Sequence, residues 1–161
     1  MKFLNSALKS FLFFSYPLEM HMVHVNSKYN GTDYYNHKDG LAVIGIFAQV
    51  GKVNSKLFKP VTYAARKLAK NSTDTIDVEL NLRRLVKKNF EFQTYFTYQG
   101  SLTTPGCNEI VTWIVSDTPF KVSRKQIKAL RSLKDSHGEP LVDNFRPTQP
   151  INGRSVFHVM N

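Results

Sequence analysis

A glutamate and two histidines lie close together in the segment YPLEMHMVHVN, residues 16–26. Imidazole nitrogens and carboxylate oxygens are common protein ligands of zinc. The segment has the composition of a β-strand, in which successive side chains point to opposite faces. Glu19 and His21 therefore share one face, and His24 lies on the other. His21 is the better ligand candidate, because a carboxylate on its own face can hold its second ring nitrogen. A hydrogen-bonded core histidine is the alternative.

A second informative segment is GSLTTPG, residues 100–106, which connects two stretches of strand-like composition. Thr103 and Thr104 precede Pro105, which restricts the backbone of the residue before it to extended conformations. Two hydroxyl groups and the nearby backbone donors are then held in a fixed, extended geometry. An ordinary connection between two strands is the alternative.

Length and composition predict one globular domain. The chain has 161 residues, of which 42% are hydrophobic, enough for a single core. No run of 18 apolar residues occurs, so we expect no transmembrane helix. Cys107 is the only cysteine, which excludes an intrachain disulfide. NGT at Asn30 and NST at Asn71 are possible glycosylation sites and would fit the secretory pathway.

The formal net charge is +10, with basic clusters in residues 83–88 and 123–134. Basic clusters can bind nucleic acids, heparin-like chains or acidic membranes, although most are solvated surface. We favour the solvated surface and expect no nucleic acid partner, because no recognition motif accompanies the charge. A polyanion-binding, β-rich domain stays open as an alternative, and salt-sensitive retention on heparin would favour it.

Hydrophobic patterning predicts a mixed, β-rich domain. Residues 41–47 are almost continuously apolar, which favours a strand buried on both faces. Ser123 and Gln126 form a capping box that predicts a helix start. Residues 143–153 are too rich in Pro, Asn and Gly for regular structure. The expected strands are residues 18–25, 41–50, 91–98, 109–117 and 155–160, and the expected helices are residues 56–70 and 123–134.

Four segments in this order resemble the α-class carbonic anhydrases: YPLEMHMVHVNSKY, DGLAVIGIF, YFTYQGSLTTPGCNEIVTWIV and VDNFRPTQPINGR. The resemblance covers residues 16–161. It implies a mainly β (α+β) fold, with a large twisted, mostly antiparallel sheet, peripheral helices, and a zinc site in a cone-shaped cavity. Residues 1–15 do not match, and we interpret them as a poor signal-like or foreign segment.

The resemblance implies a role for individual residues. His21 matches the third of three zinc-binding histidines, and Glu19 matches the carboxylate that orients it. Thr103 matches the threonine that accepts a hydrogen bond from zinc-bound hydroxide, and Thr104 matches its neighbour at the substrate site. The residues matching the apolar wall of the CO2 pocket are Val23, Val43, Leu102, Val111 and Trp113. Those matching bracing positions are Tyr98 and Arg146.

The implied reaction is the reversible hydration of CO2 to bicarbonate by a zinc lyase, in which zinc lowers the pKa of bound water to about 7. The family's other two zinc histidines lie upstream as a His-x-His pair, and nothing before residue 16 matches them. Its buried glutamate would fall near Leu8. His37, His137 and His158 are not expected to substitute. One imidazole is a poor zinc site, so we expect zinc to bind weakly or not at all.

Three hypotheses follow. The first is an extracellular-type carbonic anhydrase whose sequence here lacks its N-terminal strands. Cys107 supports it, because in secreted and membrane-anchored members a cysteine of this loop pairs with one near the domain's N-terminus. The second is an inactive carbonic anhydrase-related binding module. The third is the polyanion-binding domain. Under the first two hypotheses the chain by itself is inactive.

Overall fold

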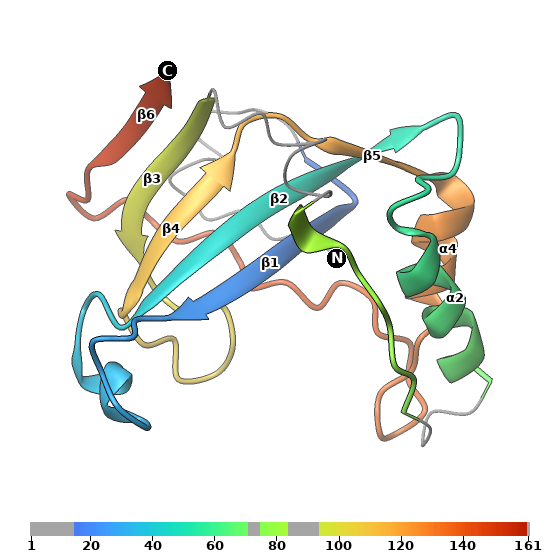
Figure 1. The fold of residues 1–161 in the computed structure, drawn as a ribbon, viewed down its shortest axis with the longest axis horizontal. Helices are drawn as coiled ribbons and strands as arrows, with labels where there is room; N and C mark the ends of the chain where they lie inside the picture. Colours follow the sequence, from blue (N-terminus) through green and yellow to red (C-terminus); the bar gives the residue numbers. More distant parts are fainter. Residues whose placement is uncertain (1–14, 71–74, 84–93, 161) are drawn as a thin grey trace.

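A six-stranded mixed β-sheet with two α-helices beyond one end makes up the described structure (Figure 1). The computed structural model describes residues 15–70, 75–83 and 94–160. In chain order the elements are β1 (Leu18–Val25), the 3-10 helix η1 (Asp33–Asn36), β2 (Leu41–Gly51), α2 (Lys59–Leu68), β3 (Thr94–Gly100), β4 (Val111–Ser116), β5 (Phe120–Ser123), α4 (Arg124–Arg131) and β6 (Val156–Met160).

The strand order is β1-β2-β4-β3-β6, with β5 pairing to β2 beyond the end of β4. The pairs β1–β2, β3–β4 and β3–β6 are antiparallel. The pairs β2–β4 and β2–β5 are parallel. The sheet is therefore mixed, and its β-rich, twisted form agrees with the fold class expected from the sequence.

β2 is the central strand, and its composition explains this position. It pairs with β1 on one side and with β4 and β5 on the other. Its side chains alternate between two hydrophobic clusters, so Val43 belongs to one and Ile46 to the other. Both residues are buried, which confirms the prediction of a strand covered on both faces.

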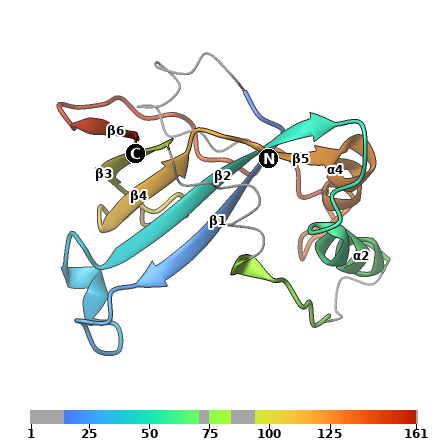
Figure 2. The same ribbon diagram turned by 45° about the horizontal axis from the view of Figure 1, so that its top comes forward.

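The second cluster packs the helices against the sheet. It contains Leu18, Ile46, Ala48, Phe58, Phe120, Val122 and Ile127. Figures 1 and 2 show α2 and α4 side by side beyond the ends of β2 and β5. The opposite face of the sheet carries the first cluster and, with it, the residues expected to do chemistry.

The capping box predicted from Ser123 and Gln126 is present at the start of α4. The Ser123 hydroxyl accepts from the Gln126 backbone N–H, and the Gln126 side chain accepts from the Ser123 N–H. The same side chain also accepts from the Ser55 N–H at 2.7 Å and donates to the Ser55 carbonyl at 3.0 Å. Gln126 thereby ties α4 to the segment before α2.

Some elements differ from expectation. β5 was not predicted, and β3 continues to Gly100 rather than ending at residue 98. Residues 91–93 of that expected strand lie outside the described residues, as do Leu8, Asn71 and residues 84–88 of the basic cluster. Within the described residues, no helix has the length and apolar character needed to cross a membrane.

Candidate active site

Strand register places the candidate residues on one face of the sheet. Val23 in β1 pairs with Val43 in β2, Val43 pairs with Trp113 in β4, and Trp113 pairs with Tyr98 in β3. These four residues form one row across the sheet. Since alternate residues of a strand share a face, His21 lies on the same face in the neighbouring row.

Glu19 and His21 form a hydrogen-bonded pair, as expected from their shared strand face. Nε2 of His21 donates to Oε1 of Glu19 at 2.9 Å, and the Glu19 side chain is only 6% exposed. This contact holds the proton on Nε2, so a metal would bind His21 through Nδ1. Burial raises the pKa of the Glu19 carboxyl above its usual value, and the hydrogen bond and charge of His21 oppose this shift.

The second oxygen of the Glu19 carboxyl, Oε2, is buried and has no hydrogen-bond partner among the described residues. A buried carboxylate oxygen without a donor is unfavourable, and this is consistent with the raised pKa. The pair is therefore oriented but not fully satisfied within this part of the chain.

Gly45 and Trp113 shape the space around this pair. Gly45 lies opposite His21 in the β1–β2 register. A Cβ at Gly45 would lie 3.2 Å from Oε1 of Glu19 and 3.5 Å from Cζ3 of Trp113. The His21 ring meets the Trp113 ring edge-on, at a centroid distance of 4.8 Å and an angle of 72°. The sequence pattern did not single out Gly45, because its importance depends on which residue lies opposite.

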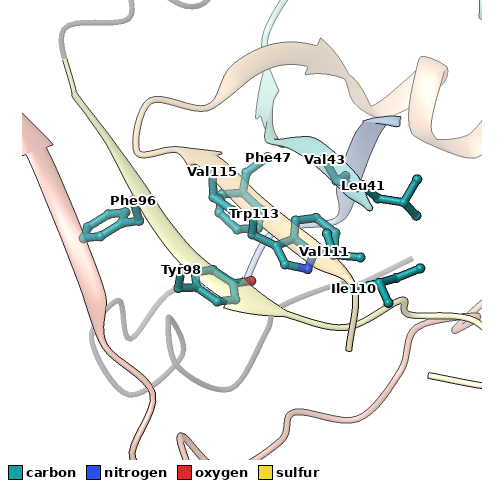
Figure 3. Packing of buried hydrophobic residues seen from close by; sticks show 9 residues of the cluster. All are labelled: Leu41, Val43, Phe47, Phe96, Tyr98, Ile110, Val111, Trp113 and Val115. Carbon is teal, nitrogen blue, oxygen red and sulfur yellow. The ribbon is translucent and has the colours of Figure 1, made fainter. Parts of the chain in front are cut away.

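The residues expected to form an apolar wall are brought together, but unequally exposed. Val43, Val111 and Trp113 are core residues at 3% exposure or less. Figure 3 shows them in one layer with Tyr98, whose ring stacks on the Trp113 ring at 6.4 Å. Leu102 packs against this cluster from the loop after β3. Val23 is 59% exposed, at the open end of the row.

The loop containing Thr103 and Thr104 is folded tightly. Backbone hydrogen bonds join the Leu102 N–H to the Asn108 carbonyl and the Cys107 N–H to the Thr104 carbonyl. The second bond closes a turn over Pro105 and Gly106, whose φ is +98°. A proline followed by a residue with positive φ is the pattern of a type II turn, which favours glycine at that place. Thr104 is exposed and Thr103 is partly buried.

Arg146 and Trp113 fix the start of this loop through Ser101. Nη1 of Arg146 donates to the Ser101 hydroxyl at 2.6 Å, and Nε1 of Trp113 donates to the Ser101 carbonyl at 3.1 Å. Arg146 thus connects the irregular C-terminal segment to the loop. Gly100 pairs with Val111 at the end of the sheet, so the loop that contains Thr103 starts there.

The described residues do not fit a three-ligand zinc site. No group of three His, Cys, Asp or Glu side chains within them is arranged to hold a metal ion. The sequence has five histidines, all inside the described ranges. The other four histidines lie in different parts of the structure. His24 is exposed on β1, and the His37 side chain contacts Asp33. His137 lies in a loop, and His158 lies on β6 near Asp117.

Two further candidate residues are accessible. Cys107 is a free thiol of intermediate exposure with a φ of +46°, and its Sγ lies 3.4 Å from the Thr104 carbonyl oxygen. Asn30 is exposed in the segment before η1. Both places are compatible with the modifications expected from the sequence, and neither modification is tested by the structure.

Comparison with known proteins defines the family. The family model "Eukaryotic-type carbonic anhydrase" matches residues 12–160, which is most of the chain. Together with the twisted β-rich sheet, this match shows that the chain belongs to the eukaryotic-type carbonic anhydrase family.

Individual relatives agree with this family. Over 146 residues the chain is 39% identical to "Carbonic anhydrase 3" of Sus scrofa, covering 88% of this chain and 55% of that protein. It is 34% identical to "Putative carbonic anhydrase 3" of Caenorhabditis elegans, covering 90% and 54%. With "Putative carbonic anhydrase 5" of the same organism the identity is 36%, covering 88% and 45%. The chain thus spans about half the length of the curated relatives it matches.

Proposed function

We propose that this chain supplies part of a carbonic anhydrase active site, whose reaction is the reversible hydration of CO2 to bicarbonate and a proton. The observation that carries this proposal is the partly buried 2.9 Å hydrogen bond between His21 and Glu19 in a chain of this family. A carboxylate that fixes an imidazole tautomer is the usual support of a zinc-binding histidine. Zinc would supply a hydroxide at neutral pH when bound by a complete set of ligands.

Other residues of this chain would receive and orient the substrate. CO2 is small and apolar overall, so it suits the apolar residues on this face: the exposed Val23 and the partly buried Leu102, which packs against the cluster that contains Trp113. The hydroxyls of Thr103 and Thr104 lie in a loop that is held by backbone hydrogen bonds and by Arg146 through Ser101. Fixed hydroxyl groups can orient a polar nucleophile without reorganising during the reaction.

The chain by itself has one histidine of the expected zinc set, and we propose that it is inactive in this form. Zinc affinity falls steeply when ligands are removed. An inactive carbonic anhydrase-related binding module is the second candidate, and the lack of a three-ligand group among the described residues favours it. The two candidates differ in whether added upstream ligands restore a metal site.

The test compares three proteins: the 161-residue chain, the chain preceded by the upstream half of the Sus scrofa relative, and the second protein carrying His21→Ala. Zinc per chain is measured after dialysis, and CO2 hydration is measured by the pH change after mixing. We expect zinc and activity only in the second protein. Robust zinc-dependent turnover by the 161-residue chain would contradict the incomplete site. A folded second protein without zinc would show that His21 is not a ligand.

We also propose that the protein passes through the secretory pathway. The exposed Asn30 sequon and the accessible Cys107 thiol support this proposal, while the names of the relatives say nothing about location. Expression in animal cells followed by glycosidase digestion tests it. A mobility shift that Asn30→Gln reduces is the expected result, and an intracellular, unglycosylated chain would overturn the proposal.

A further inference from the structure

A groove of about 1010 Å³ lies where the end of β2, β5 and the start of α4 meet. In Figure 1, β2 and β5 run side by side toward the helices, and their parallel register pairs Gln49 with Lys121 and Gly51 with Ser123. The groove is lined by residues 49–54, Lys121, Ser123, Arg124 and Lys125. It shares no residue with the candidate active site, so its function does not depend on the proposed reaction.

The groove is cationic, and none of its lining residues is acidic. Lys52, Lys121, Arg124 and Lys125 are four of its ten lining residues, and all four are exposed. Within the described residues, the ion pairs at 4.0 Å or less involve histidines only, so none of these four cations has a carboxylate partner. The groove is open to solvent, so its clustered cations attract polyanions in a way that added salt weakens.

The charge at the start of α4 works against the stability of the helix itself. Gln126, Ile127 and Ala129 are buried, whereas the exposed face carries only cations. Arg124 and Lys125 lie in the first turn, next to the positive end of the helix dipole, and no acidic residue balances them. The exposed cations of α4 are Arg124, Lys125, Lys128 and Arg131.

Like charges three and four residues apart also repel each other. A helix that breaks local stability rules on its solvent face is a candidate functional surface. An anion in the groove would relieve both the repulsion and the conflict with the dipole.

The lining chemistry selects among polyanions. Single-stranded nucleic acids are held by aromatic side chains on which bases stack, and none of the ten lining residues is aromatic. Membrane-binding surfaces insert large apolar side chains such as Trp, Phe or Leu, whereas this lining offers only Val50 and Val53. We propose that the groove binds a linear sulfated polysaccharide, whose sulfate groups pair with the four cations.

The test uses the whole chain and a fluorescent heparin oligosaccharide of defined length. One variant carries Lys52→Gln, Lys121→Gln, Arg124→Gln and Lys125→Gln. The matched control carries Lys28→Gln, Lys38→Gln, Arg66→Gln and Lys70→Gln, which removes the same charge from exposed positions outside the groove. Fluorescence anisotropy at several salt concentrations gives the affinity and its salt dependence, and circular dichroism checks that both variants are folded.

We expect the groove variant to bind about tenfold more weakly or worse at 0.1 M salt, with a shallower salt dependence, and the control to change little. Equal losses in the two variants would overturn the proposal, because net charge alone would then explain binding. A second measurement needs no variant: bound oligosaccharide should protect Lys52, Lys121 and Lys125 of the wild type from acetylation, and unprotected lysines would overturn it. Equal affinity for a size-matched RNA, or for phosphatidylserine vesicles, through the same residues would overturn the choice of polysaccharide.

Discussion

Gly100, the last residue of β3, lies so close to the Trp113 indole that no side chain fits. A Cβ there would lie 2.8 Å from Cδ1 and 3.1 Å from Nε1 of Trp113, and 3.0 Å from Cε2 of Tyr98. Both rings are 3% exposed, so neither can swing away into solvent. Overpacking a core costs about 1–3 kcal/mol, while replacing glycine by alanine gains about 0.4–1 kcal/mol through the unfolded chain. We therefore expect Gly100→Ala to lower the free energy of unfolding by about 1–2 kcal/mol.

Urea unfolding followed by circular dichroism measures this loss, and the midpoint should fall by roughly 0.5–1 M for a typical dependence on denaturant. Trp113 is the only tryptophan, so its emission reports directly on the displaced ring and on its hydrogen bond to Ser101. Gly45→Ala is the matched control, because its closest contact would be 3.2 Å, to the carboxylate oxygen of Glu19. It should cost less than Gly100→Ala. If Gly100→Ala is as stable as the wild type with unchanged emission, the reasoning about close approach is wrong.

Two further predictions concern the capping box and the buried carboxyl. Ser123→Ala removes the acceptor at the start of α4 and should cost about 1–2 kcal/mol in urea unfolding; an unchanged midpoint would contradict the structural importance of the cap. Burial raises the pKa of the Glu19 carboxyl in the folded state. The stabilisation by this carboxyl is therefore fully present below the unfolded-state pKa of 4.5, and it is lost as the pH rises through the raised pKa. The free energy of unfolding of the wild type minus that of Glu19→Gln should therefore decrease as pH rises from 4.5 to 8, and a difference that increases would refute this assignment.

Local patterns in the sequence predicted the parts of the fold that depend on local interactions. The alternation in residues 18–25 placed Glu19 and His21 on one face, and their hydrogen bond confirms that they share it. The apolar run starting at Leu41 predicted a strand covered on both faces, because side chains that alternate between the two faces are buried together only when both faces are covered. The pair of Ser123 and Gln126 predicted the start of α4, since a capping box is complete within four residues.

Features that depend on register could not be predicted in this way. β5 has four residues, Phe120–Ser123, and its strand partner is β2, about 70 residues earlier in the chain. The roles of Gly45 and Gly100 follow from the Glu19 and Trp113 side chains that lie next to them, which no local pattern reveals. The cationic groove arises in the same manner. The sequence shows that residues 123–134 are basic, but only the pairing of β2 with β5 brings Lys52 to the start of α4.

The contrast between local patterns and strand register also explains why the sequence could predict the orientation of His21 but not a complete metal site. The orientation of His21 is a local property, because successive side chains of a strand point to opposite faces and residues 19 and 21 therefore share one face. Packing beside Gly45 and Trp113 then holds the two side chains together. A zinc site needs three ligands converging on one point, and convergence depends on strands distant in the sequence. His158 lies in the same register row as His21, yet β2, β4 and β3 separate them. Added ligands can therefore complete the site only if they converge on a metal ion bound at Nδ1 of His21. Zinc binding by the extended chain is thus the decisive test of His21 as a ligand.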